Sequence, residues 1–457
     1  MVALVNRTLR TTQVSQGRHS QRSPADGCDR IDWRAGPAKI IPIAYLEERR
    51  ARARVKLPLE SVRVVDMGWV WAGALPGHIL ADMGAEVIKV ESRTHLDVMR
   101  RGRPIVGDVP DPEQQPMFHN TNRNKLSVTI NCQDPRGIEL VKGLVRISDV
   151  FLENMRVGAV EGMGLGYEDL RALKPDIVYI SLPGMGRTGP LSHLVTYGPV
   201  LTAMSGFDSM VGYEDGKVLG LQHGLADPNG GLFAALAVLV ALWHHQRTGE
   251  GQFIDLSQME SVSILLGEAI MDYVMNGRVM KPQGNRSSRM APHGIYPCQG
   301  EDKWVSVAVE SEEEWRGLLR AMGEPQWAQD PRFADRYQRL SHQEELDVHI
   351  AEWTRQYTHE EVTTILQREG VAAAPLLDVS ERLVHPLYEA RGANVWIDHP
   401  ILGGEVIYGI PWRMSDTPGE IRRRAPLMGE HNEYVLGDLL GLSRGQIEEL
   451  EREGVLQ

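Results

Sequence analysis

The sequence predicts an α/β protein in which a large Rossmann-like domain, built on a parallel sheet, is joined to a smaller α+β domain. Through the first half of the chain, short β-branched runs alternate with apolar helical stretches, as in doubly wound sheets. Glycine is frequent, at 46 of 457 residues, and many glycines stand in short turns between apolar runs. Near Gly277 the alternation gives way to a loop rich in Gly, Pro, Ser and Arg, and a different pattern follows.

Strand, helix and strand within about 30 residues form one βαβ unit. The first such unit comprises a strand, a helix and a strand, at 62–66, 74–83 and 85–90. Two further helix–strand pairs follow, at 136–146 with 150–152 and at 167–173 with 177–181. We therefore assign residues 57–265 to the large Rossmann-like domain.

The second half of the chain begins with its strongest helix, predicted over 228–245. A small α+β domain is expected over 285–385, with a strand at 304–309 and helices rich in Glu and Arg. Residues 386–457 are expected to form a return segment that packs on the large domain and ends in a polar helix over 443–453.

Residues 1–56 form a basic N-terminal extension, with 12 Lys/Arg against 5 Asp/Glu. Its first 25 residues contain four arginines, several Ser/Thr and no acidic residue, a composition also found in mitochondrial transit peptides. We favour a disordered extension or an upstream start codon. A cytoplasmic protein is therefore expected, with the mitochondrial matrix as the alternative.

The formal net charge of −12 hides a more acidic body, because residues 57–457 carry −19. Such a surface argues against nucleic-acid binding. The longest apolar run, 232–243, has 12 residues and is too short to span a bilayer, so no membrane partner is expected. Three widely spaced cysteines (Cys28, Cys132 and Cys298) and histidines without ligand spacing predict neither a disulfide framework nor a metal site.

One glycine pattern is of the kind that cradles phosphates in nucleotide-binding proteins. Residues 184–189 read G-M-G-R-T-G and fit G-x-G-x-x-G, but Pro190 follows and no helix opens there. The glycines after the first strand have the wrong spacing for a dinucleotide fingerprint. We therefore expect no permanently bound cofactor.

Asp227 stands immediately before Pro228 at the head of the strong apolar helix. An Asp–Pro pair at this place is a good N-cap with proline at the first helical position, and this structural role alone would explain it. The same position also suits a nucleophile, because the helix dipole and amide donors hold a carboxylate ionised. An ionised carboxylate held against a thioester can attack it and form an acyl-enzyme anhydride.

Eight short stretches follow one another along residues 57–300. They read VDMGWVWAG (65–73), LADMGAEVIKVE (80–91), NRNKLSVTI (122–130), FLEN (151–154), SLPGMGRTGP (181–190), YGP (197–199), LAD (225–227) and RTGEGQ (247–252). As an ordered set they resemble the class III CoA-transferases, the family of formyl-CoA transferase, carnitine CoA-transferase and α-methylacyl-CoA racemase.

The resemblance implies a large and a small domain joined by long linkers, with two chains threaded through each other as interlocked rings. A homodimer is therefore expected, or a heterodimer with a paralogous subunit. The resemblance also implies that Asp227 is the catalytic nucleophile, which attacks an acyl-CoA and then carries CoA as an aspartyl-CoA thioester until a carboxylic acid accepts it. Coenzyme A and acyl-CoA are then substrates.

Further site residues follow from the resemblance. Trp71 and Ala72 match the turn that faces the thioester, and Asn154 matches a CoA-contacting position. The basic groups expected near the CoA phosphates are Arg93 and Lys125. From the residues alone, Lys125 could equally be a strand-edge charge and Asn154 a turn former.

The substrate pocket is expected to include Trp69, Tyr197 and the pair Gly284 and Asn285, which begin a loop resembling the family's mobile flap. Formyl-CoA transferase has His and Gln where this chain has Trp69 and Trp71, so we expect a larger, less polar acyl group than oxalate or formate. Both indoles could instead be core residues. The Tyr-Gly-Pro at 197–199 resembles the branch that handles carnitine-like and substituted dicarboxylic acids.

Two alternatives remain beside the transferase. An acyl-CoA racemase or isomerase of the same fold needs a histidine base where this chain has Tyr197 and Gly198, so exchange of the α-proton is not expected. A non-catalytic subunit of a heteromeric CoA-transferase is the second alternative, and the retention of Asp227 counts against it.

Overall fold

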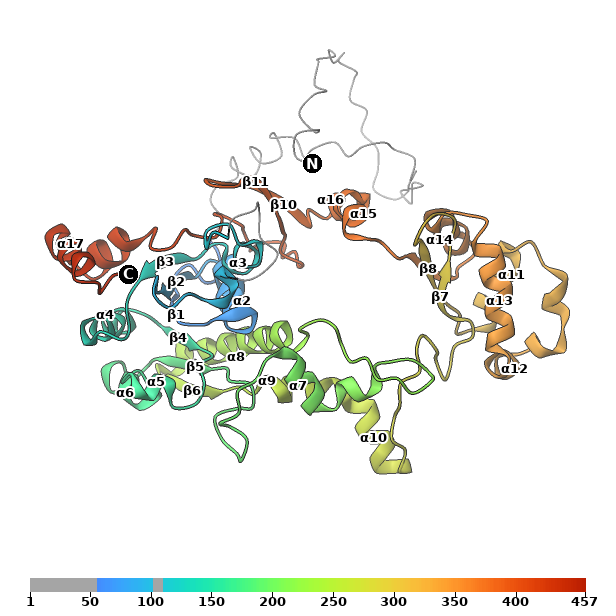
Figure 1. Ribbon diagram of the computed structural model, residues 1–457, viewed down its shortest axis with the longest axis horizontal. Coiled ribbons are helices and arrows are strands. Elements are labelled where there is room, and N and C mark those ends of the chain that lie inside the picture. Colours follow the sequence, from blue (N-terminus) through green and yellow to red (C-terminus); the bar gives the residue numbers. More distant parts are fainter. Residues whose placement is uncertain (1–55, 102–109) are drawn as a thin grey trace, which may run out of the picture. The chain divides into compact units, whose positions relative to one another are not determined.

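The computed structural model describes residues 56–101 and 110–457 (Figure 1), so the predictions made for residues 1–55 lie outside it. Its first sheet has six parallel strands in the order β3-β2-β1-β4-β5-β6. The strands are β1 (Arg63–Asp66), β2 (Glu86–Glu91), β3 (Leu126–Thr129), β4 (Val150–Glu153), β5 (Val178–Ser181) and β6 (Gln252–Asp255). This is the strand order of a Rossmann sheet, and it confirms the predicted α/β fold class.

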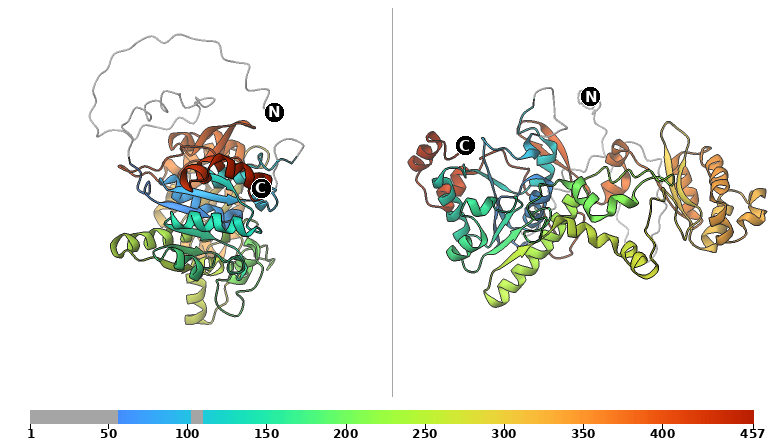
Figure 2. Two further views of the ribbon diagram at one scale, coloured as in Figure 1. Left: turned by 90° about the vertical axis from the view of Figure 1, so that its left-hand side faces the viewer. Right: turned by 60° about the horizontal axis from the view of Figure 1, so that its bottom comes forward.

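Helices cover both faces of this sheet, because neighbouring residues along a strand point to opposite sides. On β1, Val64 shares an apolar core with Ala72 of α2, whereas Val65 shares a second core with Val141 of α4. Figure 2 shows helices on either side of the strands. One face carries α2 (Val70–Asp82) and α8 (Ala226–Thr248), and the other carries α4 (Pro135–Arg146), α6 (Tyr167–Leu173) and α17 (Arg444–Arg452).

The element boundaries agree with the sequence pattern to within a few residues, with two informative exceptions. The helix after β1 begins at Val70 rather than at residue 74, so the tryptophan pair belongs to a turn and a helix start. Strand β3 reads L-S-V-T and gives no clear strand signal. Its polar residues Ser127 and Thr129 are nevertheless buried, because the C-terminal segment covers them.

A separate apolar core surrounds a second, antiparallel sheet with the order β7-β8-β9. Trp315 and Leu318 of α11 pack into this core, and Ser311 and Glu314 form a capping box that starts the helix. The sheet and its helices are β7 (His293–Pro297), β8 (Trp304–Ala308), β9 (Ala372–Pro375), α11 (Glu312–Ala321), α12 (Arg336–Ser341), α13 (Gln343–Thr354) and α14 (His359–Arg368).

The C-terminal segment lies against the β3 edge of the first sheet. The amide of His431 donates to Ser127 O at 3.0 Å, and the amide of Asn131 donates to Val455 O at 2.8 Å. This segment comprises α15 (Val379–Val384), α16 (Pro386–Ala390), the hairpin of β10 (Asn394–His399) and β11 (Gly403–Tyr408), a π-helical stretch (Glu433–Leu439) and α17. The remaining α-helices are α3 (Pro116–Asn122), α5 (Ala159–Gly162), α7 (Gly198–Ser205), α9 (Gln258–Ser263) and α10 (Gly267–Asn276), and short 3-10 turns span Val98–Arg100, Phe207–Met210, Ile264–Leu266, Gln326–Gln329 and Pro331–Phe333.

Within the described residues, α8 is the one helix long and apolar enough to cross a membrane by length and composition alone. The helix has 23 residues and is therefore longer than the 12-residue apolar run at 232–243. Its first and last turns lie outside that run and contain glycine and polar residues. A core helix of a soluble protein passes the same test, and this one buries Gly231, Ala234 and Val238. These small residues pack toward α2 and the sheet, as expected of a layer helix in an α/β fold.

Candidate active site

The strand order of the first sheet reverses between β1 and β4, and ligands of such sheets bind outside the carboxyl ends of the strands at this switch point. The loop after β1 contains Trp69, and the loop after β4 begins with Asn154. The two loops are joined by a pair of hydrogen bonds, because Asn154 Oδ1 accepts from Trp69 N–H and Asn154 Nδ2 donates to Trp69 O, both at 2.8 Å. Asn154 therefore holds the first loop in place.

Two glycines allow this loop to fold tightly, and we call it the 68–73 turn. A Cβ atom on Gly68 would lie 2.2 Å from Gly73 O, and one on Gly73 would lie 2.5 Å from Asn154 Oδ1. No side chain fits at either position, which explains why the sequence has glycine there.

The 68–73 turn also contains backbone strain. Val70 has φ +59°, in the left-handed region that β-branched residues avoid. Such a conformation costs about 1–3 kcal/mol and persists where the surroundings impose it. The next two amides, of Trp71 and Ala72, open helix α2 and have no acceptor among the described residues. They therefore form a pair of amide donors at the positive end of the helix dipole.

Helix α8 brings Asp227 to the same edge of the sheet. Both α2 and α8 run antiparallel to the strands, since α2 follows β1 and α8 precedes β6 in one parallel sheet. The two helices pack closely, and a Cβ atom on Gly231 would lie 2.9 Å from Leu75 Cβ. One helical turn before Leu75 and Gly231 are Trp71 and Asp227, so the carboxylate lies alongside the first turn of α2.

Asp227 is not the N-cap that its local sequence favours. Helix α8 begins at Ala226, which puts Asp227 inside the first turn, and the cap position falls on Leu225 without a side-chain hydrogen bond. Among the described residues nothing donates a hydrogen bond to the Asp227 carboxylate, and burial raises the pKa of Asp227 from 3.8 to about 6. The expected stabilisation of the charge by helix amides is therefore not met, and the pKa moves in the opposite direction.

Gly198 and Tyr197 lie next to this carboxylate. A Cβ atom on Gly198 would lie 3.1 Å from Asp227 Oδ1 and would press on the carboxylate, so glycine favours this close approach. The side chain of Tyr197 is 65% exposed and precedes α7. Gly198 thus lies beside the predicted nucleophile, and Tyr197, which was predicted for the substrate pocket, directly precedes it in the chain.

Lys125 is not placed to contact a phosphate. Its side chain is 0% exposed, and its ammonium donates to Asp66 Oδ2, Ala74 O and Asn122 Oδ1 at 2.7, 2.7 and 2.9 Å. Burial lowers the pKa of Lys125 to about 8 against the opposing effect of Asp66. Lys125 instead stabilises α2 through its hydrogen bond to Ala74 O. The sequence pattern alone could not distinguish a phosphate ligand from a buried ion pair.

Of the other predicted contacts, Arg93 is exposed after β2 and donates to Met428 O at 2.9 Å. Trp69 is half-buried, and its ring lies 5.5 Å from that of the exposed His95. The indole of Trp71 packs into apolar clusters around Leu75 and Met99, and its Nε1 is buried without a hydrogen-bond partner among the described residues. The expectation of a bulky acyl group relied on both indoles, and Trp71 no longer supports it because its ring packs against the protein's own apolar residues.

The loop that begins with Gly284 and Asn285 is held by another part of the chain. Gly284 N–H donates to Gly212 O at 3.1 Å, and Arg286 forms ion pairs with Glu214 and Asp347. The structure thus fixes this loop to the 212–218 turn and to α13.

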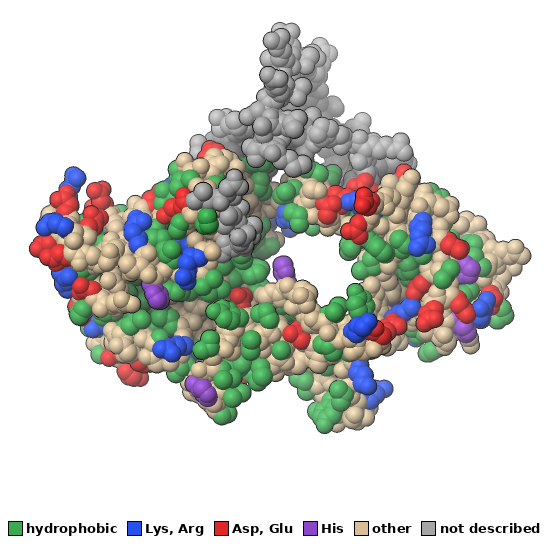
Figure 3. Space-filling view, in the orientation of Figure 1, with side chains coloured by type: hydrophobic (Ala, Val, Ile, Leu, Met, Phe, Trp, Pro, Cys, Tyr) green, Lys and Arg blue, Asp and Glu red, His purple; other side chains and the backbone are tan. Residues whose placement is uncertain are grey.

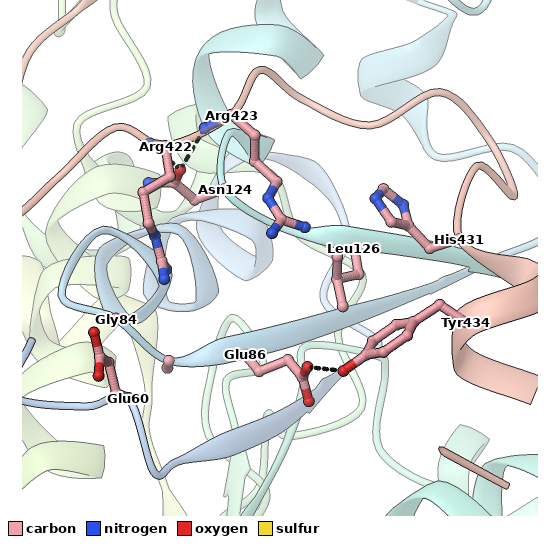
Figure 4. A pocket seen from close by; sticks show the side chains of 10 residues that line it. Glu60, Gly84, Glu86, Asn124, Leu126, Arg422, Arg423, His431 and Tyr434 are labelled. Carbon is pink, nitrogen blue, oxygen red and sulfur yellow. Dashed lines mark hydrogen bonds between the residues drawn. The ribbon is translucent and has the colours of Figure 1, made fainter. Parts of the chain in front are cut away.

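A cavity of about 370 Å³ lies at the opposite, amino edge of the sheet (Figure 4). It is lined by Glu86 and Leu126, which begin β2 and β3, and by Arg423, His431 and other residues of the C-terminal segment. Its location separates it from the switch point, so it takes no part in the chemistry at Asp227. In the described part of the chain no group of His, Cys, Asp and Glu could hold a metal ion.

Three residues of the site were not found from the sequence. Val70 reads as an ordinary helix residue, Asp97 as a loop acid and Lys89 as one charge in an apolar strand. The usable signal was Lys89, because a cation within a buried parallel strand requires a carboxylate partner.

At the switch point of this Rossmann sheet, a carboxylate and two helix amides have no partner among the described residues, an arrangement suited to enzymes that act on carbonyl groups. Residues 59–432 match the family described as CoA-transferase family III. The chain belongs to CoA-transferase family III, and it is a transferase whose family acts on CoA thioesters and carboxylic acids.

Two relatives and one solved structure show the extent of the similarity. The chain is 36% identical to a succinyl-CoA–D-citramalate CoA-transferase of Chloroflexus aurantiacus over 87% of its length and 98% of that protein. It is 33% identical to the beta subunit of a succinyl-CoA–L-malate CoA-transferase of the same organism, over 88% and 98%. A CAIB/BAIF family protein from Brucella suis shares the fold with a TM-score of 0.77 and 30% identity, over 84% and 99%.

Proposed function

We propose that this protein is an acyl-CoA:carboxylate CoA-transferase in which Asp227 is the nucleophile. The observation that carries the proposal is a partly buried carboxylate, near two amides at the start of α2, all three without a hydrogen-bond partner in the part of the chain that the structure describes. Because desolvation raises its pKa, the ionised Asp227 is a stronger nucleophile than an exposed carboxylate.

Each step of the proposed reaction exchanges one acyl bond. An Asp227 oxygen attacks the thioester carbonyl, the C–S bond breaks, and an acyl-aspartyl anhydride and CoA thiolate result. The thiolate attacks the aspartyl carbonyl, which releases the donor acid and leaves an aspartyl-CoA thioester. The acceptor carboxylate then attacks that thioester to form a second anhydride, and the returning thiolate takes the acceptor acyl group and frees Asp227.

The amides of Trp71 and Ala72 have the chemistry to stabilise the negative oxygen that develops in each step. Neither amide has an acceptor among the described residues, so no hydrogen bond of this kind would have to break before they bind an oxyanion. Asn154 and Trp69 shape the CoA side of the turn, and Arg93 remains the exposed basic group proposed for the CoA phosphates.

We propose short dicarboxylic acids as the acyl groups. Both relatives described above are named for succinyl-CoA, with citramalate or malate as the second acid. The packing of the Trp71 indole into the core removes one reason to expect a larger apolar group. No permanently bound cofactor is proposed, and the proposed compartment is the cytoplasm.

A dimer is proposed as the working unit, either homodimeric or with a paralogous subunit. The chain leaves the first sheet after α10, builds the second sheet and returns to the β3 edge, which is the connectivity that a ring-forming chain requires. No residue of α10 is buried, and apolar side chains cover much of α8 and α10 (Figure 3). The exposed residues are Leu232, Leu236, Leu239, Val240, Trp243, Ile270, Met271, Tyr273, Val274 and Met275.

The deciding experiment is Asp227→Asn. We expect this variant to lose turnover by more than a thousandfold with succinyl-CoA and a panel of dicarboxylic acids, while CoA binding by calorimetry is retained, because the amide cannot attack the thioester. The wild-type protein incubated with succinyl-CoA should carry an acyl or CoA adduct on the peptide that contains Asp227, detected by mass spectrometry after rapid quenching.

The matched control is Asp208→Asn, since the Asp208 carboxylate is also partly buried but accepts hydrogen bonds from Thr202 and Leu221. Normal turnover in Asp227→Asn would refute the proposal that Asp227 is the nucleophile. Incorporation of deuterium at the α-carbon of an acyl-CoA would favour the racemase, and activity that needs a second polypeptide would favour the subunit role.

A further inference from the structure

The 68–73 turn is held at each of the backbone groups that lead into α2. The holding groups come from the ends of β1, β2 and β4 and from the loop after β2. The partners are Asp66 Oδ1 for Gly68 N–H (2.8 Å), Lys89 Nζ for Gly68 O (2.7 Å), Asn154 for both polar groups of Trp69 (2.8 Å each) and Asp97 Oδ1 for Val70 N–H (3.1 Å).

Asp97 is the member of this set that acts on the strained residue. It is 4% exposed, and its Oδ1 accepts from the amides of Val70 and Met99 at 3.1 and 3.0 Å. Its other oxygen, Oδ2, makes no hydrogen bond within the described residues but lies 3.4 Å from Lys89 Nζ. Lys89 thus links Asp97 to the carbonyl of Gly68. Gly68 and Val70 are therefore both held by the same buried pair of charges, Lys89 and Asp97.

The charge pair is preserved by its surroundings. Burial disfavours the ammonium of Lys89, but the carboxylates of Asp97, Asp66 and Glu91 outweigh it and raise the pKa of Lys89. A buried cation in turn holds Asp97 in place, because either charge alone would be costly in the interior. The acceptor for Val70 N–H is therefore both fixed and charged, which strengthens the hydrogen bond.

Without this acceptor, the amide of Val70 would lose its hydrogen bond, and a restraint that acts directly on the left-handed residue would be removed. The residue would relax toward negative φ, and the peptide planes that follow it would rotate. Those planes carry the amides of Trp71 and Ala72, whose aim at the thioester oxygen is what the proposed chemistry requires.

We propose that Asp97, paired with Lys89, is a positioning residue that holds Val70 in the left-handed conformation and so aims the amides of Trp71 and Ala72. The inference rests on the proposed function. It adds that the donors at this site are created by imposed backbone strain and by a carboxylate that never touches the substrate.

The test combines loss with rescue. Asp97→Ala should slow the formation of acyl-enzyme in a single turnover by about 10–100-fold, with little change in KM for the acyl-CoA, since the rest of the CoA contacts are retained. Glycine adopts φ near +60° without strain. The double variant Val70→Gly/Asp97→Ala should therefore recover most of the rate lost in Asp97→Ala.

A purely structural role for Asp97 predicts a different result. Asp97 also caps the 3-10 turn Val98–Arg100, and the control for lost capping is Asp134→Ala, because Asp134 caps α4 in the same way and its side chain accepts from Arg136 rather than from the 68–73 turn. If Asp97→Ala keeps the wild-type rate, or if glycine at position 70 gives no recovery, the inference is wrong. If Asp97→Ala does not fold, Asp97→Leu/Lys89→Met serves instead, because it removes the acceptor without leaving a buried charge unpaired, and the same recovery by glycine at position 70 is required.

The outcome is separable from that of the proposed function. Loss of the adduct and of turnover in Asp227→Asn establishes the nucleophile whatever Asp97 does. A full rate in Asp97→Ala together with an inactive Asp227→Asn would overturn only the positioning role. Normal turnover in Asp227→Asn, in contrast, would remove the reaction that Asp97 is proposed to serve.

Discussion

At the scale of single residues, side chains of the same chemical type acquire different roles through their surroundings. Lys125 and Arg93 are both basic residues that were predicted to lie near the CoA phosphates. Lys125 is buried against α2, whereas Arg93 is exposed at the carboxyl edge of the sheet. Asp66 and Asp227 are both buried or partly buried carboxylates. Asp66 accepts hydrogen bonds from Gly68 and Lys125, whereas Asp227 has no such partner among the described residues.

The unpaired state of Asp227 predicts a specific pH dependence. With a pKa near 6, the nucleophilic form should be lost below this pH, and kcat/KM should fall about tenfold for each further pH unit. The measurement is a pH–rate profile between pH 4.5 and 8 with succinyl-CoA as donor. A profile that stays flat down to pH 5 would show that the carboxylate is solvated or hydrogen-bonded in solution.

The same shift has a consequence for stability. Because the pKa of Asp227 is higher in the folded chain than its ordinary value of 3.8, the folded state binds more protons between about pH 4 and 6, and stability falls as pH rises through this window. Asp227→Asn should therefore be more stable than wild type at pH 8, by on the order of 1–2 kcal/mol. The difference should disappear near pH 4, as measured by chemical denaturation.

At the scale of elements, the site depends on how closely α2 and α8 approach each other. Small residues on α8, including Gly231 and Ala235, face Leu75 and Ile79 of α2. This contact sets the distance between the first turns of the two helices, where Trp71 and Asp227 lie. The sequence predicts both helices, but the small residues on α8 do not by themselves indicate which helix packs against them.

Gly231→Ala tests this contact. The new Cβ atom would lie 2.9 Å from Leu75 Cβ, which is attached directly to the backbone, so the helices must separate. We expect a loss of about 1–3 kcal/mol in the free energy of unfolding, with a lower turnover. The control is Gly445→Ala in α17, where a Cβ atom meets nothing within 4 Å and stability should not fall. Wild-type stability in Gly231→Ala would contradict the close packing.

At the scale of the whole molecule, the chain carries more exposed apolar surface than a monomer ordinarily presents. Helix α10 buries none of its ten residues, and the outer face of α8 is apolar over several turns. Contiguous apolar surface of this kind marks an interaction site. The length and hydropathy of α8 would also pass for a membrane span, and a second protein chain accounts for its outer face without a bilayer.

A dimer makes a further prediction. Val274 on α10 is 71% exposed, and Val274→Glu should weaken association because it puts a charge into an apolar interface. We expect sedimentation velocity to show a dimer for the wild type and a larger monomer fraction for the variant. Tyr337→Glu, at a similarly exposed position on α12, is the control and should leave the dimer intact. A wild-type monomer at micromolar concentration would contradict the proposal.

The amino-acid sequence by itself determined the fold class, most helices and strands of the first sheet, and the family, because hydrophobic periodicity and ordered short motifs are local properties. It also singled out Asp227, Tyr197 and Asn154. It could not separate a cap from a free carboxylate, or a phosphate ligand from a buried ion pair at Lys125. These choices depend on which groups arrive from strands 20 to 60 residues away, as Lys89 and Lys125 do beneath the 68–73 turn.

Only the tertiary structure decided the strain at Val70 and the pKa of Asp227. A left-handed valine is unfavourable on its own, so no local pattern predicts it, and it exists because Asp97 in the loop after β2 and Asn154 in the loop after β4 impose it. Likewise, the pKa of a carboxylate is set by the water and donors that neighbouring elements remove or supply. Sequence specifies which groups are present, and packing specifies which of them remain without a partner.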